Sequence, residues 1–136
     1  MSKEKQLVAR FYNECLNVNS GAEPVIVLEE LLAETFLSKN AAELKTKAQL
    51  TAQIGFFWKL MPDLSWKIKE MIQEDNIVVV RSELSGSPIG HFMGMELNGS
   101  KTFTTMAIDI HTVENGKIDS VYHLEEWLTA IAQLKA

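Results

Sequence analysis

The stretch Ala107-Ile-Asp-Ile-His-Thr-Val-Glu-Asn-Gly-Lys-Ile118 decides how this chain folds. Apolar and polar residues alternate on both sides of its Asn-Gly pair, which is the strongest short-range signal of a β-hairpin turn. The alternation predicts two antiparallel strands, over residues 101–113 and 117–125. These strands carry Asp109 and His123 among apolar neighbours, so the hairpin is also the first place to look for chemistry.

The residues just before this hairpin predict more of the same sheet. Side chains alternate between apolar and polar over residues 64–71, and the β-branched run Ile77–Val80 is typical of a central strand buried on both faces. Residues 92–97 are predicted to be extended, and Asn98-Gly99 to form a turn. We therefore expect four or five antiparallel strands.

Helices are predicted at both ends of the chain. Apolar residues recur at helical spacing over residues 7–16, and a proline at the first turn begins a second helix over 24–32. Asn40, with a glutamate three residues later, is predicted to cap a third helix that ends before Pro62. A short helix over residues 127–134 closes the chain.

Helices followed by an antiparallel sheet indicate an α+β fold. A chain of 136 residues without repeats or a linker is expected to form one domain, spanning residues 1–136. A curved sheet covered by helices can enclose a pocket between the two layers.

Charge and composition narrow the class of partner and the compartment. The net charge of −5, without a basic run, argues against nucleic acid or an anionic membrane as partner. The longest apolar runs, Val25–Leu28 and Ile77–Val80, are too short to cross a bilayer, and the N-terminus shows no apolar signal segment. Cys15 is the only cysteine, which excludes an internal disulfide and fits a reducing compartment. We therefore expect a cytoplasmic protein.

Several short motifs, taken in their order and spacing, resemble those of one protein family. They are Met61-Pro62-Asp63-Leu64, Val79-Val80-Arg81, Gly86, Gly90 followed by Phe92-Met93-Gly94, Asn98-Gly99, Asn115-Gly116-Lys117-Ile118 and Glu126-Trp127. The chain resembles the SnoaL-like polyketide cyclases, in the superfamily with the cone-shaped nuclear-transport-factor-like fold. The resemblance covers residues 61–136, and the N-terminal helices match in pattern only.

The resemblance implies a fold and a class of chemistry. The fold is a cone-shaped α+β barrel, in which N-terminal helices pack on a curved, mostly antiparallel sheet and enclose an apolar pocket. Such proteins are usually homodimers without a metal or organic cofactor, so we expect a homodimer that binds a small hydrophobic ligand. The same scaffold hosts isomerases, dehydratases, epoxide hydrolases and non-catalytic binding proteins, which leaves the reaction open.

Two residues of the hairpin form the candidate catalytic pair. The founding cyclases close a ring by intramolecular aldol condensation, with a histidine and an aspartate beside this turn as acid–base groups. In this chain Asp109 stands at the family's histidine position and His123 at its aspartate position, so the two residue types are exchanged. We interpret His123 as the base or acid and Asp109 as its orienting partner.

The register of the hairpin decides whether Asp109 and His123 meet. A two-residue loop at Asn115-Gly116 pairs Glu114 with Lys117 and places the two residues on opposite faces of the sheet. A three-residue loop with a glycine bulge, or a bulge elsewhere in the hairpin, places them on one face. There a carboxylate raises the pKa of an imidazole, and the pair can move protons beside a carbonyl group. Both registers stay open, and the second equally fits a hairpin with one solvated face.

Further residues are candidates for the ligand pocket. Methionine and aromatic side chains suit a pocket for a flat apolar ligand, and the same residues also fit plain core packing. The candidate substrate-binding residues are Tyr12, Gln53, Trp58, His91, Phe92, Met93, Met106, Tyr122 and Glu126. His111 is expected to be exposed. The histidines show no metal-ligand spacing, so no metal site is expected.

Three functions are compatible with this sequence. The leading one is a cofactor-free cyclase or isomerase that acts on a small hydrophobic, polyketide-like carbonyl compound through Asp109 and His123. The second is a non-catalytic module that binds a small molecule, and the third is a dimerisation domain of the same fold. The identity of the substrate does not follow from the sequence.

Overall fold

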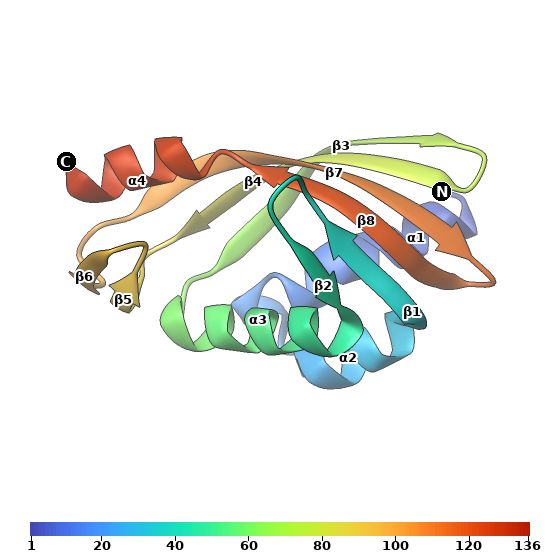
Figure 1. The fold of residues 1–136 in the computed structure, drawn as a ribbon, viewed down its shortest axis with the longest axis horizontal. Coiled ribbons are helices and arrows are strands. Elements are labelled where there is room, and N and C mark those ends of the chain that lie inside the picture. Colours follow the sequence, from blue (N-terminus) through green and yellow to red (C-terminus); the bar gives the residue numbers. More distant parts are fainter.

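The computed structural model describes residues 1–136 and shows an α+β fold, as expected (Figure 1). The helical elements are α1 (Lys3–Arg10), the π-helical turn η1 (Phe11–Cys15), the 3₁₀ turn η2 (Val18–Ser20), α2 (Pro24–Leu31), α3 (Lys47–Leu60) and α4 (Trp127–Lys135). The strands are β1 (Leu32–Lys39), β2 (Leu44–Thr46), β3 (Ser65–Glu74), β4 (Ile77–Gly86), β5 (Ile89–Phe92), β6 (Met95–Asn98), β7 (Phe103–Glu114) and β8 (Lys117–Glu125). None of the helices is both long and apolar enough to cross a membrane.

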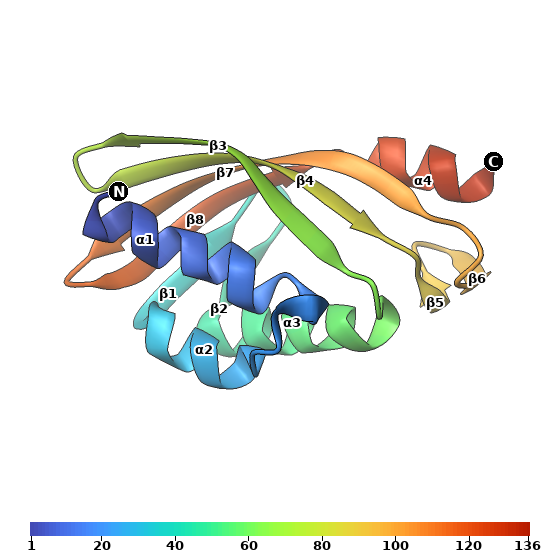
Figure 2. The same cartoon turned by 180° about the vertical axis from the view of Figure 1, so that it is seen from behind.

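Six strands form one curved sheet in the order β2-β1-β8-β7-β4-β3, and β5 and β6 form a separate hairpin. Neighbouring strands are antiparallel except β1 and β8, which are parallel. Helices α1, α2 and α3 lie on one side of the sheet, which we call the covered face (Figures 1 and 2). No helix lies over the middle of the opposite side, which we call the bare face.

Strand β7 shows how the covered face forms the core. Its side chains alternate between buried and exposed along the strand, as the two-residue period requires. The buried set includes Phe103 and Ala107, and also the polar Asp109 and His111. His111 is 1% exposed, so the expectation that it is exposed was wrong. His111 lies two positions after Asp109 in the strand, so the two side chains point to the same side of the sheet.

The β7–β8 hairpin has the predicted turn. Glu114 pairs with Lys117, so the loop contains only Asn115 and Gly116. Their φ angles are 50° and 73°. A type I′ turn needs positive φ at both central residues, and asparagine and glycine adopt that conformation most readily. The loop is therefore the two-residue form.

A bulge in β8 then changes the register. The partners of Ile118 and Ser120 are consecutive residues of β7, so Asp119 is an extra residue without a partner. One extra residue moves every later side chain of β8 to the other face of the sheet. As a result, Asp109 lies directly opposite His123. The hairpin thus combines the two-residue loop with a bulge elsewhere, and the candidate pair shares the covered face.

The first two strands and the start of α3 differ from the sequence-based expectation. Thr46, rather than Asn40, caps α3: its hydroxyl accepts from the Gln49 amide, and the Gln49 side chain accepts from the Thr46 amide. The Asn40 side chain instead accepts from the amides of Ala42 and Glu43 in the β1–β2 turn. Strand β1 was not predicted because an irregularity early in the strand breaks its alternation.

The predictions for two further segments were wrong. Strand β4 is not buried on both faces: Val78 and Val80 are fully buried, whereas Ile77 is 41% exposed because its side of the sheet is the bare face. Residues 92–97 do not form one extended segment. They bend at Met93-Gly94, where both φ angles are positive, and this bend joins β5 to β6.

Candidate active site

A cavity of about 260 Å³ lies between the covered face of the sheet and α3. Aromatic and aliphatic side chains from η1, α3, β3 and α4 form its apolar walls. Strands β7 and β8 and the β1–β2 turn supply most of its polar groups. The polar residues that line it are Ser38, Asn40, Glu43, Gln53, Asp109, His111, His123 and Glu125.

Asp109 projects from β7 into this cavity and is 4% exposed. The hydroxyl of Tyr12, from η1, donates a hydrogen bond to Asp109 Oδ2 over 2.5 Å. Burial raises the pKa of Asp109 to about 7, while the Tyr12 hydrogen bond and the charge of His123 act against that rise. The carboxyl group therefore holds a proton much more readily than an exposed aspartate does. Tyr12 occupies Oδ2, which leaves Oδ1 for a ligand.

His111 is the second hydrogen-bond partner of the Tyr12 hydroxyl. Its Nε2 lies 2.7 Å from the Tyr12 oxygen, and burial lowers the pKa of His111 to about 3, so the ring is neutral. Burial and the charge of Asp109 raise the pKa of Tyr12, which therefore keeps its proton. A phenol donates only one hydrogen bond. When Tyr12 donates to an ionised Asp109, His111 must donate to Tyr12 from Nε2–H.

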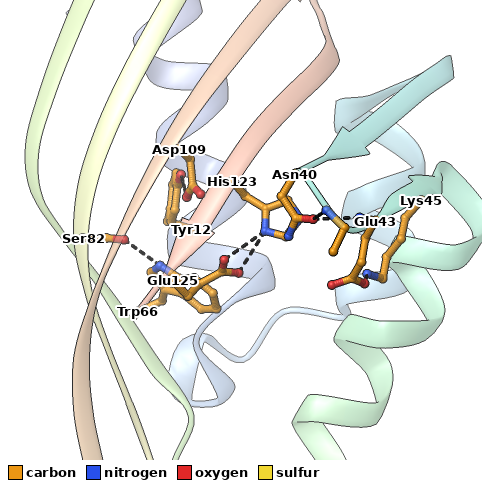
Figure 3. Close-up of polar contacts among 10 residues, drawn as sticks. Tyr12, Asn40, Glu43, Lys45, Trp66, Ser82, Asp109, His123 and Glu125 are labelled. Atoms are coloured by element: carbon orange, nitrogen blue, oxygen red, sulfur yellow. Dashed lines mark hydrogen bonds and ion pairs between the residues drawn. The ribbon is translucent and has the colours of Figure 1, made fainter. Parts of the chain in front are cut away.

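His123 lies on β8 and is held by Glu125, two residues further along the same face. Its Nδ1 lies 2.9 Å and 3.1 Å from the two carboxylate oxygens of Glu125, as the two dashed lines in Figure 3 show. The hydrogen bond to Glu125 raises the pKa of His123, although burial acts against it. The other ring nitrogen, Nε2, is buried and has no hydrogen-bond partner. His123 lines the cavity, and Nε2 is the ring nitrogen that the protein leaves without a partner.

Asp109 and His123 therefore face one cavity from neighbouring strands. They are directly opposed in the register, where paired Cβ atoms lie about 4.5–5.5 Å apart. No hydrogen bond joins the two side chains. Tyr12 positions Asp109, and Glu125 rather than Asp109 contacts the His123 ring. The arrangement places one carboxyl group and one imidazole ring on the same wall of the cavity.

Of the nine predicted binding residues, five line the cavity or lie directly around it. Gln53 and Met93 line the cavity as expected. Tyr12 lies behind Asp109 and reaches the cavity only through it. Trp58 and Phe92 belong to the packing around the cavity: the Trp58 indole donates to the Cys15 carbonyl over 2.7 Å, and Phe92 stacks on Phe103.

The remaining four predicted binding residues do not line the cavity. His91 is exposed and contacts Glu96 across the β5–β6 hairpin. Met106 and Tyr122 point to the bare face, because they have the opposite parity to Asp109 and His123. Glu126 is exposed at the start of α4 and makes no side-chain capping bond.

Sequence reasoning missed five polar residues of the cavity, Ser38, Asn40, Glu43, His111 and Glu125, and two of these had a signal in the sequence. Glu125 follows His123 by two positions, so strand alternation alone would have placed it beside the histidine. His111 relates to Asp109 in the same way. No group of three or more His, Cys, Asp or Glu side chains is arranged to hold a metal ion.

Comparison with known proteins gives one family and one fold. The family model of the SnoaL-like polyketide cyclases matches residues 6–134. A candidate SnoaL-like polyketide cyclase from Jannaschia sp. CCS1 has a similar structure, with a TM-score of 0.85, 19% identity, and 98% of this chain and 92% of that chain covered. The candidate polyketide cyclase IdmH from Streptomyces antibioticus gives a TM-score of 0.82 and 19% identity, over 99% and 100% of the two chains.

A third similar structure carries a different functional description. AclR from Streptomyces galilaeus, a candidate hydroxylase, gives a TM-score of 0.84 and 16% identity, over 99% and 97% of the two chains. No functionally curated protein matches the sequence. At these identities the structural likeness shows the fold, and the chemistry has to be argued from the residues of the site.

Replacing Tyr12 by phenylalanine should raise the pKa of Asp109 further above about 7. The substitution removes a hydrogen bond that favours the carboxylate and leaves only the charge of His123 to oppose the effect of burial. A ¹³C NMR titration of the Asp109 carboxyl carbon measures this shift. His91→Gln changes an exposed ring outside the cavity and should leave the pKa unchanged. A pKa that stays the same or falls in Tyr12→Phe would show that the phenol does not stabilise the carboxylate.

Proposed function

This chain belongs to the SnoaL-like polyketide cyclase family, and we propose that it is a cofactor-free acid–base enzyme of cyclase or isomerase type. Its substrate is a small hydrophobic compound with a carbonyl group. One observation supports this above all: Asp109 and His123 line the same cavity from directly opposed positions, and Nε2 of His123 has no hydrogen-bond partner in the protein.

Asp109 acts as the base in this proposal. Its Oδ1 takes a proton from the carbon beside the substrate carbonyl, and the electrons of that C–H bond form an enolate. The pKa of about 7 suits the task, because a general base works best when its pKa lies near the operating pH. Tyr12 keeps Oδ2 occupied, so the proton transfer is confined to the oxygen that faces the substrate.

His123 acts on the substrate oxygen. Glu125 holds Nδ1 and favours the protonated ring, so Nε2–H can donate to the carbonyl oxygen as negative charge develops there. In an isomerase, Asp109 returns the proton to another carbon of the enol. In a cyclase, the enol carbon bonds to a second carbonyl carbon, and the resulting alkoxide takes a proton from His123. Acid–base assistance of this kind is typically worth about 10²–10⁴-fold in rate.

We also propose that the chain forms a homodimer through the bare face of its sheet. Apolar side chains of β7 and β8 gather there: Met106, Ile108, Ile110, Tyr122 and Leu124 are between 36% and 69% exposed. Contiguous exposed apolar side chains of this kind mark an interaction surface. A second copy related by a two-fold axis would present the same apolar chemistry to them.

The proposed chemistry predicts exchange of the protons beside the carbonyl of 1-tetralone, a neutral two-ring ketone, when the protein is present in D₂O. The exchange rate is measured by ¹H NMR. Asp109→Asn and His123→Ala should each lower the protein-dependent rate by about 10²-fold or more, because each removes one of the two proton-transferring groups. His91→Gln removes a histidine that lies outside the cavity and should leave the rate unchanged.

A rate that does not exceed that of buffer, or that is the same in both variants and the wild type, would contradict the proposed enzyme. If 1-tetralone still binds in that case, the non-catalytic binding module becomes the better account of the fold.

If the dimer forms through the bare face, a charge introduced there should separate the two subunits. Ile108→Lys should shift the mass measured by light scattering from that of a dimer to that of a monomer, because a lysine would be buried unpaired in the interface. Ile26→Lys places the same charge at an exposed isoleucine of α2, away from this face, and should leave the dimer intact. A monomeric wild type, or a dimeric Ile108→Lys variant, would contradict the proposal.

A further inference from the structure

We propose that the cavity selects uncharged carbonyl compounds of one ring or two fused rings and discriminates against larger or anionic compounds. This inference rests on the proposed function for the carbonyl group, and on the size, walls and charges of the cavity for the rest.

The volume of the cavity sets the size limit. An enclosed apolar cavity of about 150 Å³ holds one benzene molecule. A volume of about 260 Å³ is less than twice that, so it accommodates one substituted ring or two rings that share an edge. Pockets for drug-sized ligands usually measure about 300–1,000 Å³, which places this one just below that range.

The walls that face the ligand are held in place by contacts of their own. The indole of Trp66 donates to Ser82 Oγ over 2.6 Å, which fixes the orientation of the ring. Phe57 and Trp127 lie against each other with their ring centroids 6.4 Å apart, and both also contact Phe92. Because closely packed aromatic side chains do not move apart without losing contacts, these walls limit the width of a ligand that lies between them.

These aromatic walls also favour a flat ligand. Trp66, Phe57 and Trp127 line the cavity from three different elements, β3, α3 and α4. A planar ring placed among them gains aromatic contacts beyond the burial of its surface. The ligand carbonyl would then lie at the strand side of the cavity, where His123 Nε2 lacks a hydrogen-bond partner.

The charges of the cavity exclude anions. No lysine or arginine lines it, and its ionisable residues are Glu43, Asp109, His111, His123 and Glu125, of which His111 is neutral. The one cationic ring, His123, is already paired with Glu125, and Lys45 behind the cavity is paired with Glu43. A carboxylate or phosphate on the ligand would therefore enter a site with excess negative charge and no free cation, which costs binding energy.

Gln53 suggests a second point of recognition. This residue of α3 lines the cavity, and its amide makes no hydrogen bond within the protein. It can bind a hydroxyl or a second carbonyl oxygen on the side of the ligand that faces the helix. A compound with two oxygens on one or two rings would use both His123 and Gln53.

Four probes test the size and charge limits by NMR titration of the ¹⁵N-labelled protein: acetophenone, 1-tetralone, 9-fluorenone and 1-naphthoate. We expect saturable shifts at cavity residues with acetophenone and 1-tetralone. The three-ring ketone 9-fluorenone and the anionic 1-naphthoate should each bind at least tenfold more weakly than 1-tetralone. Since 9-fluorenone is the more apolar ketone, a binding site without a size limit would reverse that order.

A variant with an enlarged cavity tests the size limit directly. Leu50→Ala removes a buried aliphatic wall of α3 and should improve the binding of 9-fluorenone relative to 1-tetralone by about tenfold. Ile54→Val, a smaller change on the same helix, should act in the same direction and is less disruptive to folding.

Three results would overturn the inference: equal or tighter binding of 9-fluorenone, equal or tighter binding of 1-naphthoate, or no binding of any of the four probes. The proton exchange of 1-tetralone, measured in the same samples, separates this inference from the proposed chemistry. Selective binding without exchange would contradict the chemistry and leave the size and charge limits standing.

Discussion

The bulge at Asp119 is the constraint on which the rest of the site depends. Side chains alternate between the two faces of a strand, so one unpaired residue reverses the orientation of every side chain after it. With the bulge, His123 and Glu125 join Asp109 on the covered face. Without it, they would point to the bare face, and Tyr122 and Leu124 would point into the cavity instead. Strand β1, paired in parallel with β8 beyond the bulge, holds this register from the other edge.

A second constraint is the burial of Asp109. An isolated carboxylate in this position would be strongly disfavoured, and its pKa of about 7 records that penalty. Tyr12 and His111 reduce the penalty by forming a buried chain of hydrogen bonds that ends on one carboxyl oxygen. The same chain leaves the other oxygen open to the cavity. The protein thus keeps a weakly basic carboxyl group inside an apolar layer, which is what proton abstraction beside a carbonyl requires.

The sequence predicts the strands and the family better than the site. The Asn115-Gly116 turn was predictable because few dipeptides adopt two positive φ angles. The placement of Asp109 and His123 on one face was one of two arrangements left open, and it was expected to make them diagonal neighbours rather than a direct pair. A bulge has no clear signature of its own, so the choice could not be made. Strand β1 was missed because its alternation is broken, and the cavity residues contributed by the β1–β2 turn were missed with it. Met106 and Tyr122 were misplaced because apolar side chains fill a bare sheet face as readily as a pocket.

The most direct test of the account is an NMR pH titration of His123 in the wild type, in Glu125→Gln and in Asp109→Asn. The account predicts a His123 pKa above the usual value of about 6.5 in the wild type. It predicts a large fall in Glu125→Gln, which loses the main stabilising contact, and a smaller fall in Asp109→Asn, which loses only a nearby charge. A His123 that titrates near its usual value and responds to neither substitution would contradict the shared cavity, and with it the proposed acid–base pair.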